Sequence, residues 1–193
     1  TGAAISWSGL STAGEYTVIA TNNNGCTNTM LSSATITENP KPTIFAINNV
    51  EQCAGLLDVT LTGSQSGVNY MLLRDGHDAG KSIQTGGSGN LTWSGLYEVG
   101  TYTVQSTYPS TGCTQVMGYE AIIKSKPTAY TVGGGGSFCE DEGASFNVTL
   151  SDSEVDVNYQ LRLNNSTDVG SSKPGTGAAI SWSGLSTAGE YTV

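Results

Sequence analysis

The order of apolar and polar residues along this chain predicts short strands. Val59 and Leu61 alternate with polar residues in one run, and Tyr102 and Val104 do so in another. Residues that alternate in this way place one face of a strand on a core and the other in water. No window has the i, i+3, i+4, i+7 apolar spacing of a helix over three turns.

Turn residues divide the central part of the chain into seven such runs. The predicted strands cover residues 43–50, 57–63, 69–74, 81–85, 90–96, 101–108 and 114–124. Several short strands in a unit of this length are typical of an immunoglobulin-like sandwich. The expected fold class is therefore all-β, with tandem immunoglobulin-like, seven-stranded Greek-key β-sandwich repeats.

The sequence repeats at two scales. Residues 1–18 recur without a change as residues 176–193, which lie 175 positions later. A weaker similarity, between the segments that begin at Cys53 and Cys139, divides this period into units of about 87 residues. We interpret the chain as part of a longer array, because identity of this kind is the signature of repeat proteins. The array would consist of the C-terminal half of a preceding repeat (1–42), one complete repeat (43–127) and the N-terminal part of the next repeat (128–193).

A spacing of six residues between a leucine and a tyrosine recurs in every repeat. In the tyrosine corner of Greek-key sandwiches, a buried phenol forms a hydrogen bond to the backbone a few residues upstream. The expected structural corners are Leu96 with Tyr102, Leu10 with Tyr16, and Leu185 with Tyr191. This spacing concerns architecture and not chemistry.

The cysteines occur singly, without a Cys-x-x-Cys pair or a neighbouring histidine, so disulfides fit them better than zinc. We expect Cys53 to pair with Cys113 inside the complete repeat. Cys26 and Cys139 would then pair with neighbouring copies of the repeat. Disulfides place the protein in an oxidising compartment, outside the cell or on its surface.

The charge and the lengths of the apolar runs exclude two classes of partner. The net charge is −9 and there are only seven lysines and arginines, so no basic stripe is available to neutralise phosphates and no nucleic-acid partner is expected. No apolar run is long enough to span a bilayer, so membrane insertion is not expected either.

The single histidine offers little for catalysis or metal binding. His77 lies between Asp75 and Asp78, and the Asp-Gly pair at this point is first a hairpin signal. One imidazole and two turn carboxylates lack the fourth ligand that zinc needs. No Ser-His-Asp set recurs in the second repeat, so we expect no catalytic residues, no cofactor and no enzyme.

Acidic residues cluster in the last repeat and are weak candidates for calcium. The candidates are Glu140, Asp141, Glu142, Asp152 and Asp156, with Glu154 between the last two. Carboxylate oxygens on loops between tandem domains are ligands that calcium prefers. Solvated charge on turns is the favoured interpretation, and no EF-hand-like loop is present.

Each tryptophan precedes Ser-Gly-Leu, at Trp7, Trp93 and Trp182. A fixed place in every repeat favours a position in the core, because the repeat needs one large apolar side chain there. The alternative is an aromatic platform on which sugars stack.

Two stretches carry a family resemblance. Gly-Thr-Tyr-Thr-Val followed by Gly-Cys-Thr within residues 100–114, and Gly-Glu-Tyr-Thr-Val followed by Gly-Cys-Thr within residues 14–27, resemble the repeats of giant Bacteroidota surface proteins. The best known are the SprB-type gliding-motility adhesins. The chain departs from that pattern at residues 63–70, where Gly-Ser-Gln-Ser-Gly-Val-Asn-Tyr replaces a Gly-Gly-x-x-Pro-Tyr segment. The resemblance implies export by the type IX pathway and a location on the bacterial cell surface or outside the cell.

The expected function is that of a structural repeat in a long cell-surface adhesin or extracellular filament. Proline-stiffened linkers and disulfides would make it a semi-rigid stalk for attachment and gliding. Its partners would be neighbouring copies of the same repeat. The alternative is a carbohydrate-binding module of a secreted multidomain protein, with surface glycans as the partner.

Overall fold

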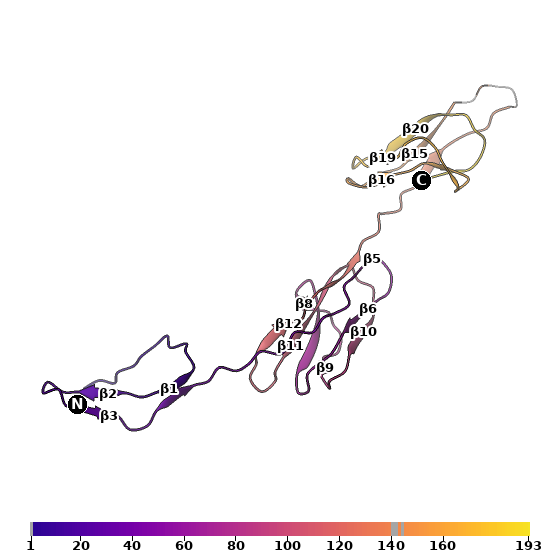
Figure 1. Ribbon diagram of the computed structural model, residues 1–193. Coiled ribbons are helices and arrows are strands. Elements are labelled where there is room, and N and C mark those ends of the chain that lie inside the picture. The colour runs from indigo at the N-terminus through magenta and orange to yellow at the C-terminus, as the bar shows by residue number, and fades with distance from the viewer. Residues whose placement is uncertain (1, 140–142, 144) are drawn as a thin grey trace. The chain divides into compact units, whose positions relative to one another are not determined.

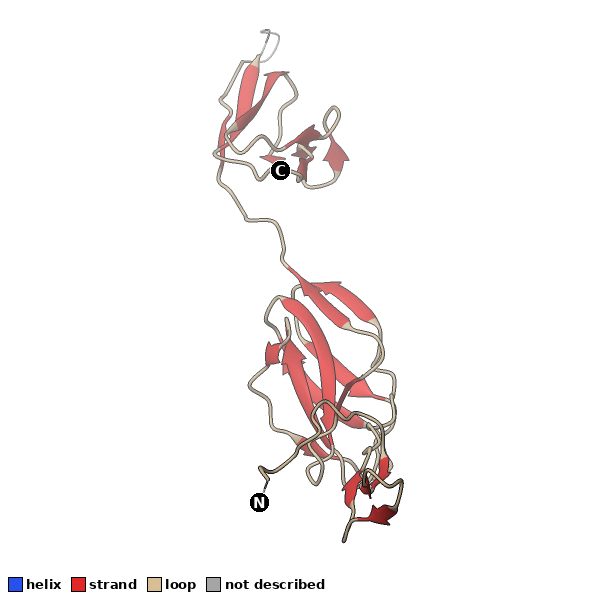
Figure 2. Cartoon of the chain, turned by 90° about the vertical axis from the view of Figure 1, so that its left-hand side faces the viewer, coloured by secondary structure: helices blue, strands red, loops and turns tan. Residues whose placement is uncertain are grey.

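The computed structural model describes residues 2–139, 143 and 145–193. The chain falls into two compact units, Thr1–Lys124 and Ser125–Val193. Every regular element in the described part of the chain is a strand (Figure 2), so the all-β prediction is confirmed.

Among the described residues, none belongs to a helix long and apolar enough to cross a bilayer.

The first unit begins with four short strands, which Figure 1 shows at the indigo end of the chain. They are β1 (Gly14–Tyr16), β2 (Ile19–Thr21), β3 (Thr27–Thr29) and β4 (Ala34–Ile36). β1 pairs with β4 and β2 pairs with β3, both antiparallel. We call residues 14–36 the N-terminal hairpin. Most of its side chains are exposed.

The complete repeat follows and holds two sheets. Its strands are β5 (Val50–Cys53), β6 (Leu57–Leu61), β7 (Asn69–Arg74), β8 (His77–Asp78), β9 (Gln84–Thr85), β10 (Leu91–Leu96), β11 (Gly100–Thr107), β12 (Thr114–Val116) and β13 (Ala121–Lys124). β6 and β10 form one sheet, and the other strands form the second in the order β5-β13-β11-β7-β8, with β12 beside β11 and β9 beside β7. Only β5 and β13 pair in parallel.

One apolar core joins these two sheets. Val59 and Leu61 of β6 belong to the same buried cluster as Tyr70, Leu72 and Val104 of β7 and β11. All five side chains are fully buried, and polar neighbours alternate with them along β6 and β11, whereas β7 has the apolar Met71 and Leu73 between and after them. The alternating pattern in the sequence therefore reports which face of β6 and of β11 covers the core.

The first and last predicted strands of the complete repeat are wrong in their bounds. In place of one strand over 43–50, Ala46 bridges to Gly118, Ile47 bridges to Leu61 in the other sheet, and strand β5 begins only at Val50. The segment thus changes sheets part-way, so it cannot form one continuous ladder. The strand expected over 114–124 is split into β12 and β13, and Tyr119 between them has a positive φ of 65°.

The C-terminal unit contains β14 (Val132–Gly134), β15 (Phe146–Leu150), β16 (Asn158–Tyr159), β17 (Arg162–Leu163), β18 (Thr167–Asp168), β19 (Lys173–Pro174), β20 (Ile180–Leu185) and β21 (Tyr191–Thr192). They form the sheets β14-β15-β20, β16-β19 and β18-β17-β21. Trp182 lies opposite Val148, as Trp93 lies opposite Val59 in the complete repeat. The register of this unit thus reproduces that of the complete repeat.

Candidate functional site

The predicted disulfide between Cys53 and Cys113 is wrong. Cys53 lies opposite Lys124 at one end of the large sheet, whereas the Cys113 carbonyl accepts a hydrogen bond from Tyr108 N at the other end. About nine residue steps along β11 separate these ends, which is roughly 30 Å at the rise of a strand. A disulfide needs Cα atoms within about 7 Å, and all four cysteines are free in the structure.

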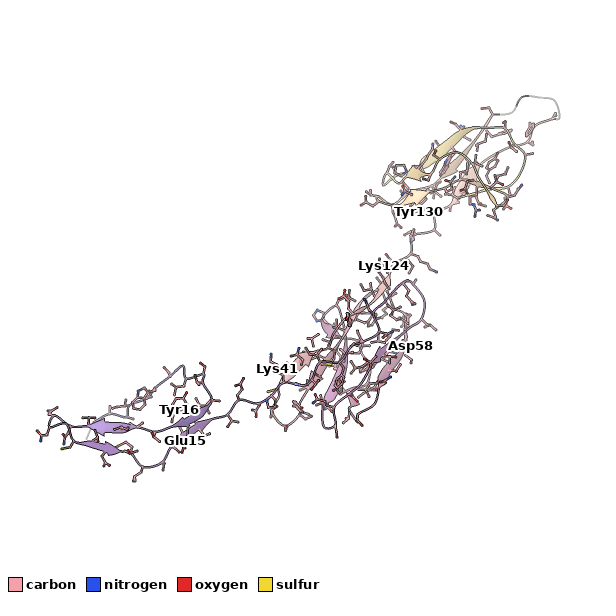
Figure 3. The ribbon with its side chains drawn as sticks, viewed as in Figure 1. Glu15, Tyr16, Lys41, Asp58, Lys124 and Tyr130 are labelled. Carbon is pink, nitrogen blue, oxygen red and sulfur yellow. The ribbon has the colours of Figure 1, made fainter. Side chains whose placement is uncertain are left out.

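The two thiols therefore lie at opposite ends of the complete repeat. The Cys113 Sγ is 3.8 Å from the carbonyl oxygen of Asn39, which precedes the repeat. Figure 3 labels Lys41 near this end and Lys124 at the other, where Lys124 forms an ion pair with Glu51. That pairing raises the pKa of the Lys124 ammonium, mainly through the hydrogen bond to Glu51.

The loop around His77 is a tight hairpin turn. β7 and β8 pair with Arg74 opposite His77, and the two residues between them, Asp75 and Gly76, both have positive φ (51° and 80°). This is the backbone of a type I′ turn, which Asp-Gly favours. The Asp75 Oδ1 accepts a hydrogen bond from Thr101 N at 2.9 Å. The carboxylate thus holds the turn against β11.

Asp152 and Glu154 of the C-terminal unit accept hydrogen bonds from the backbone. The Asp152 Oδ1 accepts from Ser153 N at 2.7 Å, and the Glu154 Oε1 accepts from Thr128 N at 2.6 Å. Hydrogen bonds from Thr128 lower the pKa of Glu154 below its usual value. Asp156 is exposed with a positive φ of 66°.

The remaining calcium candidates, Glu140, Asp141 and Glu142, lie outside the described residues. No cluster of three acidic, histidine or cysteine side chains that could hold a metal occurs in the described ranges.

Two of the tryptophans lie in cores, as predicted. The exposed fraction is 3% for Trp93 and 6% for Trp182. The Trp93 indole donates a hydrogen bond to the carbonyl of Ser82 at 3.2 Å. Trp7 is 61% exposed, because the N-terminal segment has no core of its own to cover it. No sugar-stacking surface can be built on an indole as buried as that of Trp93.

The hydrogen bond expected of a tyrosine corner is present in all three copies. The Tyr102 hydroxyl donates to the carbonyl of Glu98 at 2.8 Å, and Tyr16 and Tyr191 make the same bond four residues upstream, at 2.8 and 2.9 Å. Tyr102 is 2% exposed, and Leu96 beside it is buried as well. Burial raises the pKa of the Tyr102 phenol. In the N-terminal hairpin, Tyr16 and the neighbouring Glu15 are labelled in Figure 3.

A second polar cluster recurs in both units and had not been predicted. The buried Ser64 hydroxyl donates to Gly89 O at 2.7 Å and accepts from Gly87 N at 3.2 Å. The neighbouring Gln65 N donates to the Tyr70 hydroxyl at 2.8 Å. We call this cluster the serine clamp. It fastens the segment before β7 to the loop that leads into β10.

The equivalent serine clamp of the C-terminal unit has the same bonds. Ser153 donates to Ala178 O at 2.6 Å and accepts from Thr176 N at 2.9 Å, and Glu154 N donates to the Tyr159 hydroxyl at 2.8 Å. The signal in the sequence is Ser-x-x-x-Val-Asn-Tyr, which occurs at residues 64–70 and again at 153–159. Comparing the two repeats letter by letter would have found it.

Two open hollows lie beside apolar side chains. One, of about 960 Å³, lies in the C-terminal unit and is lined by residues that include Val148, Leu185, Tyr191 and Val193. The other, of about 580 Å³, is lined by the N-terminal segment, including Trp7 and Met30. In the complete repeat, the residues equivalent to these belong to the closed core.

Comparison with known proteins adds no relative. No protein-family model matches the chain, and no curated protein matches it.

Proposed function

We propose that this chain is a structural segment of a long cell-surface adhesin or extracellular filament, built from tandem immunoglobulin-like Greek-key sandwiches. The observation that carries the proposal is the recurrence of residues 1–18 as residues 176–193. The complete repeat and the C-terminal unit also share the strand register that sets Trp93 opposite Val59 and Trp182 opposite Val148. Stability in such arrays is nearly additive over repeats, so length can grow without a change of fold. The function is mechanical reach and attachment, and no catalytic role is proposed.

The stalk is not held together by disulfides within its repeats. The complete repeat has a continuous apolar core that includes Val59, Tyr70, Trp93 and Val104, and its thiols are far apart. Burial of apolar surface, together with the tyrosine corner and the serine clamp, is what supports the unit in this proposal.

The cellular setting of the proposal comes from the resemblance to SprB-type adhesin repeats. In this proposal the protein lies on the surface of a Bacteroidota cell after type IX export, with neighbouring copies of the repeat as its partners and gliding or attachment as its role. The acidic balance of the chain, −9 at neutral pH, suits a solvated extracellular stalk.

Labelling of intact cells tests this proposal. An antibody against the 193-residue chain should label unpermeabilised cells of the source organism, and immunogold electron microscopy should show gold particles on filaments outside the envelope. An antibody against a cytoplasmic protein in the same cells is the control. Labelling that requires permeabilisation would exclude a surface stalk.

Carbohydrate binding is the second candidate function. If the chain binds sugars, exposed tyrosines and not the buried Trp93 would form the binding surface. Tyr97 and Tyr119 are 68% and 67% exposed, whereas Trp93 is buried. Exposed aromatic rings are the groups on which sugars stack. A glycan array probed with the chain should then give binding that the Tyr97→Ala and Tyr119→Ala variants lose. The stalk proposal expects no binding that depends on these rings.

A further inference from the structure

The chain enters the complete repeat at one end of the large sheet and leaves it at the other. Thr43 N donates to the Gln65 side chain, which donates in turn to the hydroxyl of Tyr108, just beyond the end of β11. β13 ends at Lys124, beside the start of β11. Figure 3 labels Lys41 and Lys124 at these two ends. Tension along the chain therefore pulls on opposite ends of this unit.

The segment that enters the repeat runs parallel to the strand that leaves it. We call residues 45–54 the leading segment. Its strand β5 pairs with β13 in parallel, and Ala46 forms a parallel bridge to Gly118, shortly before β13 begins. The other strand pairs of the complete repeat are antiparallel. The two points that tension pulls thus belong to parallel neighbours and lie at opposite ends of their ladder.

Backbone hydrogen bonds join the leading segment to the leaving strand near each of its ends. Where the chain enters, Gly118 N donates to Phe45 O at 2.9 Å, and Gly118 O accepts from Ile47 N at 3.0 Å. Where the chain leaves, Ala54 N donates to Lys124 O at 2.9 Å. The four residue pairs of the β5–β13 ladder lie between these bonds. The contact is therefore longer than β5 itself.

A packed core lies behind this ladder. Ile47 of the leading segment and Ala121 and Ile123 of β13 are buried and belong to the core of the repeat. Between the parallel contacts, Asn48 N donates to Thr60 O of β6 at 3.0 Å. A hydrogen bond beside a dry core is stronger than one in water, so the leading segment is held firmly on both sides.

We propose that the complete repeat is a load-bearing unit and that this parallel ladder is the clamp that resists tension. A pull through Thr43 draws the leading segment toward one end of the sheet, and a pull through Lys124 draws β13 toward the other. The two strands then have to slide along each other, which loads the hydrogen bonds of the ladder together. In an antiparallel ladder the two pulled ends would lie side by side, and the bonds would open one after another at a lower force.

The clamp is a property of the fold, and its use in the cell rests on the proposed stalk function. A stalk that transmits force from an attachment point needs units that stay folded under tension. The rate of forced unfolding decides whether they do, and not the free energy of unfolding alone. Cell labelling and force measurements can fail independently of each other, so the location and the clamp have separate tests.

Single-molecule force spectroscopy of the full chain tests the clamp by changing the direction of the pull. Lys41 and Lys126, both exposed and outside the ladder, are replaced by an azide-bearing amino acid that carries the DNA handles, so tension acts on the complete repeat alone. In the control, the handles are attached at Tyr97 and Lys126. Tyr97 is exposed and precedes β11, whose first residue lies opposite Ile123. The control pull therefore opens the β11–β13 ladder one pair at a time.

The two directions should give different unfolding forces at the same loading rate. Through Lys41 and Lys126, the repeat should unfold in one step, at roughly twice the mean force of the control or more, because the ladder bonds share the load. The step should lengthen the chain by about 250 Å, since the 80 residues from 45 to 124 extend to about 280 Å and their ends are already roughly 30 Å apart in the fold. Equal forces in the two directions, or a leading segment that detaches first at low force, would overturn the proposal.

A cross-link inside the ladder tests whether the load passes between β5 and β13. Cys53 lies opposite Lys124, and neighbouring strands are about 4.8 Å apart, a distance that a disulfide can bridge. In a chain with Lys124→Cys and with serine at the other native cysteines, oxidation should abolish the step of about 250 Å, because the load then bypasses the residues between the two sulfurs. Reduction should restore the step.

Lys124→Ser in the same background is the matched control for this cross-link. It cannot form the disulfide and should keep the long step under oxidising and reducing conditions alike. A long step that survives in the cross-linked chain, or a disulfide that does not form, would contradict the clamp.

Discussion

Replacing Tyr102 with phenylalanine tests whether the tyrosine corner stabilises the complete repeat. The substitution removes one hydroxyl, which donates to Glu98 O at 2.8 Å from a side chain that is 2% exposed. A hydrogen bond of this kind contributes about 0.5–1.5 kcal/mol net, and phenylalanine fills the same space. We therefore expect the free energy of unfolding of the repeat to fall by about 1 kcal/mol, which lowers the melting temperature of a domain of this size by about 4–8 °C.

Native-state hydrogen exchange is the suitable assay, because it reports on this repeat separately from the rest of the chain. The slowest amides of β7 and β11 should lose about 1 kcal/mol of protection in Tyr102→Phe. Tyr16→Phe is the matched control. It removes the same bond, at 2.8 Å, from a hairpin outside the core, and should leave those amides unchanged.

The pH dependence of the same residue gives an independent check. Burial raises the pKa of the Tyr102 phenol, so the folded repeat favours the neutral form. The stability gained from this preference is fully present below the ordinary tyrosine pKa of about 10. It is lost as the pH rises through the higher pKa that the phenol has in the folded protein. Tyr102→Phe should therefore flatten the alkaline decline in stability. An unchanged stability in Tyr102→Phe, or an equal loss in Tyr16→Phe, would refute the assignment of a stabilising corner.

Three further predictions concern other parts of the chain. Hydrogen bonds from Thr128 lower the pKa of the Glu154 carboxyl. The stability that these bonds add is therefore present above the ordinary glutamate pKa of about 4.3 and is lost as the pH falls through the lower pKa of the folded protein. In NMR spectra the Thr128 amide shift should titrate in this acid range, and Glu154→Gln should abolish the titration. In urea denaturation, Gly86→Ala should lower the free energy of unfolding of the complete repeat by about 1–3 kcal/mol, because a Cβ there would lie 2.1 Å from the backbone oxygen of Gln65. Gly87→Ala is the neutral control, since a Cβ at that position meets nothing within 4 Å. Mass spectrometry of the purified, air-oxidised chain should find no disulfide that links the two cysteines of the complete repeat, and finding one would show that the register of the large sheet is wrong.

Local patterns were sufficient to predict a strand that turn residues bound on both sides. The run over 69–74 matches β7 in both bounds, because Gly67 lies before it and the Asp75-Gly76 turn follows it. The segment over 43–50 was predicted wrongly, since Ala46 and Ile47 bridge to different sheets. Alternation of side chains does not record which strand a backbone pairs with, so a change of sheet leaves no mark in the pattern.

The disulfide was predicted wrongly for a similar reason, because the sequence does not record how distant strands are arranged in a sheet. The spacing of Cys53 and Cys113 in the sequence suits a loop closed by a disulfide, but the ends of the sheet on which they lie depend on strand order. The serine clamp was not predicted from the sequence, for a different reason. Its key groups, such as the Ser64 hydroxyl, bond to backbone atoms, and a search for catalytic or metal-binding side chains does not look for these. The tyrosine corner was predictable because its donor and acceptor are only four residues apart.

The placement of the two thiols has a consequence for how oxidation would act on this protein. Since Cys53 and Cys113 cannot reach each other, a disulfide at either position has to involve a sulfur atom that belongs to something outside the repeat. Such a bond would leave the folding of the repeat unaided and would add a covalent link to whatever lies next to it. Redox conditions would then change what the complete repeat is linked to, and not whether the repeat itself folds.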